Sequence, residues 1–247
     1  MAGKIRRMRA RGEPEIALLG TGLYSVRQAS LLAQIPARSI RRWLFGYRYL
    51  YEGQAVEQPA VVRSQFADYA REHKVISFHD LIELMFVRAF RSEGVSWPTI
   101  RRAADRAREL TGSDHPFASQ RFVTDGETIF AEIASSIDGT ELLDLKRDQM
   151  AFRRVLLRSL RARLDVGTSG AERWWPLGKQ RPVVIDPARQ FGQPITAEEG
   201  VPTAVLAKAY DTIRSVARVA DWYCVSQGEV KAAIEFEQRI AEQRLAA

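Results

Sequence analysis

The chain has 247 residues, of which 46% are hydrophobic and 27% are charged, and its formal net charge is +7. This length allows one large domain or two ordinary ones, and the composition is that of a folded globular protein, not of a disordered or membrane-spanning one. Cys224 is the single cysteine; this excludes a disulfide framework and a thiolate metal site, and we expect a cytoplasmic protein.

The positive charge is concentrated in the first part of the chain. Residues 1–112 carry 19 basic and 11 acidic side chains, whereas residues 113–170 carry 8 and 9 and residues 171–247 carry 10 and 10. Of the 37 basic residues 31 are arginine, which favours phosphate and guanine contacts, although a GC-rich genome would give the same enrichment. A polyanionic partner should therefore dock on the first 112 residues.

The stretch from Tyr24 to Tyr47 reads YSVRQASLLAQIPARSIRRWLFGY. Ser25 followed by Gln28 is a capping box, which predicts the start of a short helix. A break at residues 34–36 follows, and proline is tolerated where a second helix begins. The pattern therefore predicts two short helices joined by a tight turn.

The second of these helices should have one apolar and one basic face. The apolar residues at helical spacing are Ile40, Trp43 and Leu44. The basic residues on the opposite face are Arg38, Arg41 and Arg42. A helix-turn-helix needs this arrangement to place its second helix in the major groove of DNA. A helical hairpin with a solvated basic face would give the same pattern.

Two segments flank this motif. Residues 1–15 hold five basic side chains and little that could be buried, so we expect a flexible basic arm. Residues 47–59, YRYLYEGQAVEQP, mix aromatic and turn residues, and they predict a short β-wing that begins near Arg48.

Two longer helices should follow the wing. The first is capped by Ser77 with Asp80 and stops at Gly94, and the second runs from a cap at Ser96 to Gly112. Four arginines of the second helix lie largely on its outside, where we expect a solvated face: Arg101, Arg102, Arg106 and Arg108. The acidic residues of the chain are scattered singly, mostly beside arginines, and predict ordinary surface ion pairs.

The middle of the chain predicts a hairpin and a long helix. Phe122–Phe130, FVTDGETIF, resembles a β-hairpin with Asp125–Gly126 as a type I′ turn. Glu141–Leu164 has an apolar repeat typical of one long helix, whose apolar stripe would suit either a core or a dimer seam. Asp165–Gly170, DVGTSG, has the composition of a linker.

The last part of the chain contains a second candidate helix-turn-helix, preceded by short β-like pieces. Short β-like pieces are expected at Pro182–Asp186 and Pro194–Thr196, and the tandem Trp174–Trp175 is expected in a core. Ser215–Tyr223 predicts a short helix, and Ser226 with Glu229 three residues later predicts another capped helix. This second helix-turn-helix candidate carries no net charge, which argues against strong phosphate binding and favours contact with protein.

Catalytic motifs are absent from the sequence. The histidines are His73, His79 and His115, and none has a metal-like partner at ligand spacing. No nucleophile elbow or P-loop occurs, and Gly20-Thr-Gly22 lacks the third glycine of a dinucleotide fingerprint. We expect a protein that is not an enzyme and that holds no metal and no cofactor.

Three sets of segments together resemble one protein family. They are SFHDLIELMFVRAFRSEGVSWPTIRRAADRARELTGSDHPFA, FVTDGETIFAEI, and the series RWWPLG…VVIDPARQFGQPI…GVPT…VADWYCVS…VKAAIEFE. The family joins a MerR-like helix-turn-helix to a C-terminal domain-of-unknown-function 433 module, and its members resemble VapB-type antitoxins, with this chain looking like a mycobacterial example. The usual small VapB antitoxin differs, being a ribbon-helix-helix or swapped-hairpin dimer with a disordered tail.

The resemblance implies a mainly α fold with small β hairpins, divided into four parts. These are a basic arm (1–15), a winged helix-turn-helix domain (16–112), a hairpin and long connecting helix (113–165), and a C-terminal helix-turn-helix module (171–247). It further implies a DNA-binding antitoxin that silences a PIN-domain ribonuclease toxin and represses its own operon. Because two half-sites double the contacts, we expect a homodimer on a palindromic operator.

Specific residues are assigned to each role. The DNA-contacting set is Arg38, Ser39, Arg41 and Arg42 in the major groove, with Arg27 and Arg48 on phosphates. An arginine inserted among the toxin's metal-binding carboxylates would compete with the metal, and the candidates for toxin contact are Arg239, Arg244 and Trp222. The alternatives are a stand-alone transcriptional regulator without a toxin partner, and a scaffold whose helix-turn-helix motifs mediate only self-association.

Overall fold

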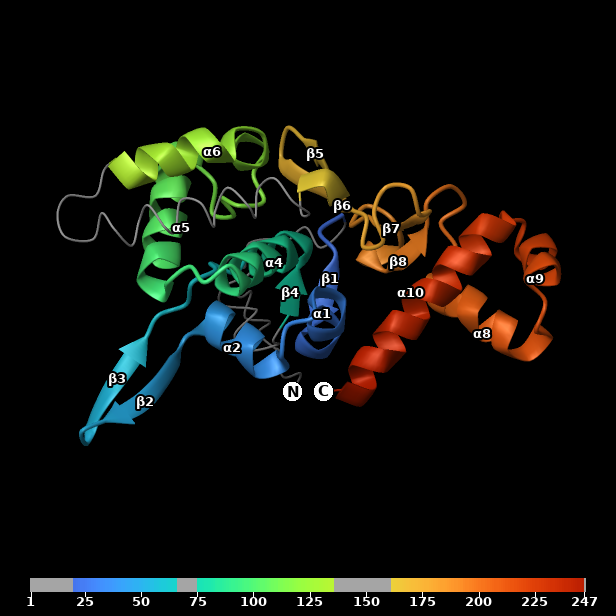
Figure 1. The fold of residues 1–247 in the computed structure, drawn as a ribbon, viewed down its shortest axis with the longest axis horizontal. Coiled ribbons are helices and arrows are strands. Elements are labelled where there is room, and N and C mark those ends of the chain that lie inside the picture. Colours follow the sequence, from blue (N-terminus) through green and yellow to red (C-terminus); the bar gives the residue numbers. More distant parts are fainter. Residues whose placement is uncertain (1–19, 66–74, 136–160, 247) are drawn as a thin grey trace, which may run out of the picture.

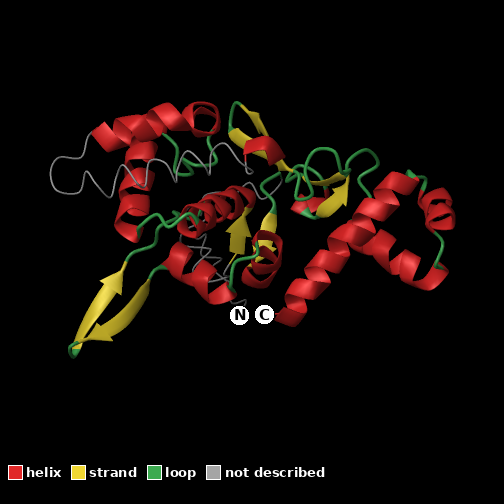
Figure 2. Ribbon diagram, viewed as in Figure 1, coloured by secondary structure: helices red, strands yellow, loops and turns green. Residues whose placement is uncertain are grey.

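A computed structural model describes residues 20–65, 75–135 and 161–246. The architecture is mainly helical with small antiparallel sheets, as expected (Figure 2). The basic arm (1–15) and most of the predicted long helix at Glu141–Leu164 lie outside the described residues. Of that predicted helix only the end is described, and there it is wrong: Arg161–Arg163 form a single 3-10 turn, η1, and Leu164 begins a β-strand.

The predicted helix-turn-helix is confirmed. After a short strand, β1 (Leu23–Ser25), helix α1 covers Val26–Ala33 and helix α2 covers Ala37–Phe45. The Ser25 hydroxyl accepts from the Gln28 N–H at 3.2 Å, and the Gln28 side chain accepts from the Ser25 N–H at 2.8 Å. Gln34 ends α1 in the left-handed region at φ 55°. The predicted wing is confirmed as the hairpin of β2 (Tyr47–Tyr51) and β3 (Gln54–Gln58).

Helix α4 (Phe78–Ser92) is the centre of the N-terminal half. Ten of its residues are buried, on every side of the helix, as expected for a helix surrounded by other elements. Strand β4 (Val75–Ser77) leads into α4 and pairs antiparallel with β1, so that Leu23 lies opposite Ser77. Each strand of this pair ends in a capping serine, and the predicted Ser77–Asp80 box is present. The entries of α1 and α4 are therefore held side by side.

Helix α5 (Trp97–Thr111) has the predicted cap at Ser96 and ends at Gly112. The hairpin predicted at Phe122–Phe130 is wrong, because these residues lie in helix α6 (Gln120–Ser135). Asp125 has φ −118°, which excludes the type I′ turn and leaves only a kink in the helix. Phe122 is fully buried, with its ring 4.9 Å from Phe117 and 5.9 Å from Phe86. Burial of this ring against α4 overrides the local turn signal.

The linker predicted at Asp165–Gly170 is also wrong, since it forms a hairpin of β5 (Leu164–Gly167) and β6 (Gly170–Trp174). The expected β-like pieces form β7 (Val183–Ile185) and β8 (Pro194–Thr196), with a 3-10 turn, η2 (Gln190–Gly192), between them. All four strands make one antiparallel sheet in the order β5-β6-β7-β8. The hairpin is fixed to the N-terminal half, because the Ala171 N–H donates to the Ala118 carbonyl at 2.7 Å.

The C-terminal module consists of α8 (Thr203–Ile213), α9 (Val216–Tyr223) and α10 (Gln227–Ala246). The predicted short helix, its turn and the Ser226–Glu229 box are confirmed: the Glu229 carboxylate accepts from the Ser226 N–H at 3.0 Å. Val219, Val230 and Ala233 lie in a small core of their own.

Helix α10 runs back from this module to the first helix of the helix-turn-helix (Figure 1). Phe236 and Ile240 of α10 are buried in a cluster to which Leu31 and Leu32 of α1 contribute. Tyr24 adds a polar contact between the halves, since its hydroxyl donates to the Gly192 carbonyl at 2.9 Å. Burial raises the pKa of Tyr24 above its usual range, which keeps this donor protonated.

Two acidic side chains of α4 are buried, which corrects the expectation that the acids form surface pairs. Asp80 accepts from the N–H groups of Ser77 and Gln65, each at 3.0 Å, and lies 2.8 Å from His115 Nε2. Glu83 is 1% exposed and accepts from the Ala118 N–H at 2.9 Å. Burial alone would lower the pKa of His115, but the hydrogen bond and charge of Asp80 raise it above the ordinary value.

Glu83 should make the stability of the fold depend on pH. Burial raises its pKa from 4.5 to about 7, so the unfolded state loses this proton at a lower pH than the folded state does. The free energy of unfolding should therefore fall as the pH rises between these two values. Glu83→Gln keeps an oxygen for the Ala118 N–H and removes the titration. We expect the stability of the variant relative to the parent to rise by on the order of 2 kcal/mol from about pH 5 to about pH 8.

Urea unfolding at several pH values measures this difference. Glu109→Gln, which changes an exposed acid of α5, is the matched control and should show no such trend. A stability difference between Glu83→Gln and the parent that stays constant with pH would contradict the assignment.

Candidate nucleic-acid interface

Helix α2 presents a basic surface to solvent. Ile40 and Leu44 are buried beneath it, and Trp43 packs edge-on against Trp97 of α5 with ring centroids 5.4 Å apart. The exposed arginines of α2 are Arg38, Arg41 and Arg42, and Ser39 between them is half-buried. No acidic residue occurs in the sequence between Glu15 and Glu52. The field over α2 is therefore positive, without nearby acids to pair with the arginines.

The start of α2 adds donors to this surface. Its N-cap is Pro36, and no side chain caps the helix. The Ser39 and Ile40 N–H groups donate to the Pro36 carbonyl, at 2.8 and 3.1 Å, but those of Ala37 and Arg38 precede any acceptor within the helix. A helix start of this kind favours phosphate oxygens.

The wing lies beside α2 and projects away from the rest of the molecule (Figure 1). The Arg42 guanidinium stacks on the Tyr47 ring at 4.9 Å from its centroid, which holds this arginine toward the wing. Arg48 pairs with Glu57 across the hairpin at 3.5 Å, and both side chains are mostly exposed. Tyr49, Leu50 and Tyr51 are also exposed. The wing thus carries aromatic and basic groups without a packed face.

The base of the wing is fixed to both α2 and α5. The Trp43 carbonyl accepts from the Val61 N–H at 2.8 Å and from the Val62 N–H at 3.1 Å. Arg101 donates to the Pro59 carbonyl at 2.7 Å, and Arg108 donates to the Val61 carbonyl at 2.9 Å. These two arginines of α5 were expected on a solvated face. They instead bind the backbone of the segment that follows β3 and hold it against α5.

A concavity beside the turn of the helix-turn-helix brings four arginines together. It has a volume of about 790 Å³, and we call it the arginine hollow. Its basic residues are Arg27 of α1, Arg38 and Arg41 of α2, and Arg244 from the end of α10. Three of the predicted DNA-contacting residues thus meet here, whereas Arg42 and Arg48 lie on the wing side. The addition of Arg244 was not predictable, because nothing in the sequence indicates that α10 returns to α1.

The residues predicted to contact a toxin do not form one patch. Trp222 is 68% exposed on α9, which packs against the beginning of α10. Arg244 lies at the other end of α10, a helix of 20 residues that spans about 30 Å at 1.5 Å per residue. Arg239 lines a different pocket, between the two halves.

The described residues contain no group of side chains that could hold a metal ion and no helix that could cross a membrane. Within residues 20–65, 75–135 and 161–246, no three His, Cys, Asp or Glu side chains gather where they could ligate a metal. Over the same residues, no helix combines the length and hydropathy that crossing a membrane requires.

Residues 22–104 match a protein family described as "Putative DNA-binding HTH domain". This segment holds the helix-turn-helix, the wing, α4 and half of α5. This match, the fold and the basic surface of α2 together support a DNA-binding helix-turn-helix domain in this part of the chain.

One named relative and one crystal structure are similar to most of the chain. "Putative antitoxin VapB45" of Mycobacterium tuberculosis is 25% identical over 235 residues, which cover 91% of this chain and 98% of that protein. The crystal structure of Rv2018 from Mycobacterium tuberculosis has the same fold, with a TM-score of 0.63 at 21% identity, over 87% of this chain and 99% of that one.

Gly46, between α2 and the wing, should be essential for the placement of the wing. Its φ of 70° and ψ of −177° are open almost only to glycine, and an added Cβ would lie 2.6 Å from the Gln58 carbonyl oxygen. We expect Gly46→Ala to lower the free energy of unfolding by about 3 kcal/mol. Urea unfolding followed by circular dichroism measures the loss.

Gly53→Ala is the matched control in the turn of the wing. Gly53 has a similar φ of 78°, but no atom lies within 4 Å of an added Cβ. It should cost only about 1 kcal/mol. Equal losses for the two variants would show that the close approach of Gln58 does not matter.

Proposed function

We propose that this chain is a DNA-binding antitoxin that represses its own operon. The observation that carries the DNA-binding role is the acid-free arginine surface of α2 beside the wing, within the residues that match the helix-turn-helix family. The antitoxin role is supported by the similarity to "Putative antitoxin VapB45" across 91% of the chain. The chain acts by binding and not by catalysis.

In this proposal α2 enters the major groove of the operator. Arg38, Ser39, Arg41 and Arg42 reach the base edges, where arginine pairs best with guanine. Arg27 and Arg48 contact phosphates on either side. The exposed Arg48–Glu57 pair contributes at most about 1 kcal/mol, so a phosphate replaces Glu57 at little cost.

A homodimer on a palindromic operator fits this mode of binding. One helix of nine residues reads only a few base pairs, and two copies double the contacts. The recognition helices of such dimers lie one turn of DNA apart, about 34 Å.

Removal of the α2 arginines should abolish operator binding. For the triple variant Arg38→Ala, Arg41→Ala and Arg42→Ala, we expect the affinity for DNA upstream of the chain's own gene to fall by at least about 100-fold. The slope of log affinity against log salt should change by less than about 1, because these arginines reach base edges and the phosphate contacts of Arg27 and Arg48 remain. Gel shifts between about 50 and 200 mM salt measure both quantities.

The matched control removes three arginines from the C-terminal half: Arg181→Ala, Arg214→Ala and Arg218→Ala. It has the same net charge as the first variant and should keep both the affinity and the salt slope. If the two triple variants lost affinity equally, general charge and not α2 would account for the binding.

The proposed toxin is a PIN-domain ribonuclease, a nuclease with clustered carboxylates around a divalent cation. Trp222 is the strongest of the three candidate contacts, because a large exposed aromatic side chain on a folded helix is a typical hot spot of an interface. Arg239 and Arg244 are also exposed, and either could pair with toxin carboxylates. A stand-alone transcriptional regulator is the alternative function.

Trp222→Ala should weaken inhibition of the nuclease encoded beside this gene by at least about tenfold, without loss of DNA binding. The measurement is ribonuclease activity titrated with the chain. Tyr51→Ala, which removes an aromatic side chain of similar exposure from the wing, is the control and should leave inhibition unchanged. If no nuclease co-purifies with the parent chain from its own cells, the stand-alone regulator is the better proposal.

A further inference from the structure

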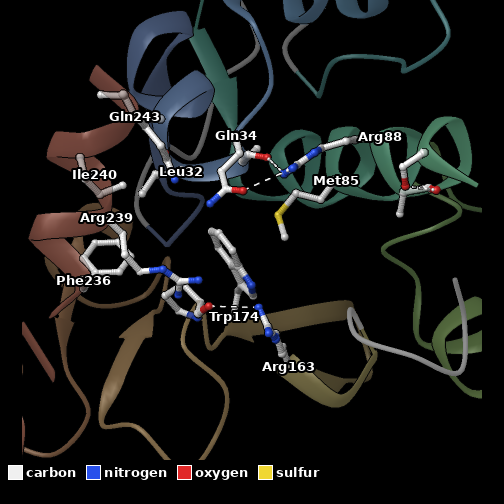
Figure 3. A pocket seen from close by; sticks show the side chains of 15 residues that line it. Leu32, Gln34, Met85, Arg88, Arg163, Trp174, Phe236, Arg239, Ile240 and Gln243 are labelled. Carbon is white, nitrogen blue, oxygen red and sulfur yellow. Dashed lines mark hydrogen bonds between the residues drawn. The ribbon is translucent and has the colours of Figure 1, made fainter. Parts of the chain in front are cut away.

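A second pocket lies between the N-terminal and C-terminal halves of the molecule, and we call it the interhalf pocket (Figure 3). Its volume is about 320 Å³, at the lower end of the range of about 300–1,000 Å³ for small-molecule sites. Its walls come from α1 and α4 on one side and from β6 and α10 on the other.

The walls of this pocket are partly apolar and partly polar. The main apolar side chains are Leu31, Leu32, Met85, Trp174, Phe236 and Ile240. The indole of Trp174 stands in the middle of the view, with Met85 to one side and the side chains of α10 to the other (Figure 3). An aromatic or branched aliphatic group that packs against these side chains would be partly removed from water.

The charges that line this pocket are all positive. Arg88, Arg163 and Arg239 are among the lining residues, and no acidic side chain is. Arg88 donates to the Ala33 carbonyl at 2.6 Å and Arg163 to the Pro176 carbonyl at 3.2 Å. Within the part of the chain that the structure describes, Arg239 makes no hydrogen bond or ion pair. Its guanidinium extends from α10 toward Trp174 (Figure 3).

A buried hydrogen-bond donor of the same pocket also lacks a partner. Trp174 is 4% exposed, and its indole Nε1 has no acceptor among the described residues. Each such group costs about 1–3 kcal/mol when it stays unpaired, so native folds rarely retain one without use. The indole N–H can only donate, and it therefore requires an acceptor.

We propose that the interhalf pocket binds a small organic anion with an apolar body, such as an aromatic or branched aliphatic carboxylate or sulfonate. The anionic oxygens take the free donors of Arg239 and the Nε1–H of Trp174. The apolar body packs against the leucines of α1, Met85 and Phe236.

This site goes beyond DNA and toxin binding, because it makes the chain responsive to a small molecule. α1 is the first helix of the helix-turn-helix, and α10 belongs to the C-terminal module. A ligand held between them adds contacts that exist only while the two helices stay together. Occupancy therefore fixes the C-terminal module against the DNA-binding domain.

The test uses the full chain alone, with a fluorescent amphipathic anion as the probe. The probe is 8-anilinonaphthalene-1-sulfonate, and N-phenyl-1-naphthylamine, the same molecule without the sulfonate, is its neutral counterpart. We expect the anion to bind at one site per chain and at least about tenfold more tightly than the neutral compound. Arg239→Gln should weaken binding of the anion by about tenfold and leave binding of the neutral compound unchanged.

Two control variants make the result specific. Arg239→Lys keeps the positive charge and should recover most of the affinity for the anion. Arg218→Gln, which removes an exposed arginine of α9 away from the pocket, should bind as the parent does. Equal affinity of the anion for the parent and for Arg239→Gln would overturn the proposal, as would equal affinity of the two probes for the parent. Neither outcome depends on whether DNA or a toxin binds.

Discussion

The carboxylate of Asp80, buried at the start of α4, is the interaction on which the rest of the structure depends. It accepts hydrogen bonds from Ser77, Ser64 and Gln65 and lies against His115. One side chain thus joins the entry of the central helix, the segment that leaves the wing and the loop before α6. A carboxylate at this position is stable only because donors surround it, since an unpaired buried charge would cost several kcal/mol.

The position of the wing beside α2, the surface proposed to bind DNA, follows from this anchoring. Val61 and Val62 of the segment that Asp80 holds donate to the last turn of α2, and Arg101 and Arg108 of α5 fasten the same segment. The wing therefore keeps one position relative to the α2 arginines before any DNA is present. A preformed surface of this kind loses little conformational entropy on binding.

The C-terminal half is joined to this surface through α10 and Tyr24. Because α10 lies along α1, its arginines line the arginine hollow and the interhalf pocket, instead of forming a separate patch with Trp222. The end proposed to bind DNA and the end proposed to bind a protein therefore share helix α10. A change in the position of α10 at one end would move residues at the other.

The sequence by itself determined the parts that depend on neighbours within a few residues. The capping boxes at Ser25, Ser77 and Ser226, the basic face of α2, helix α9 and the start of α10 were all predictable, because capping and amphipathic spacing act within one or two turns. Helix α8 was not predicted. Only the tertiary structure decided the secondary structure of Phe122–Phe130, which is helical, and of Asp165–Gly170, which lies in a β-hairpin. There a turn-like local sequence was overridden by burial of Phe122 and by the backbone contact between Ala118 and Ala171.

The same distinction holds for the candidate sites. The arginines of α2 are read from one helix, but the meeting of Arg27, Arg38 and Arg41 with Arg244 depends on contacts across about 200 positions of the chain. The periodicity within one helix does not predict such a contact. The contact arises only when the apolar face of α10 that includes Phe236 packs against α1 in the folded protein.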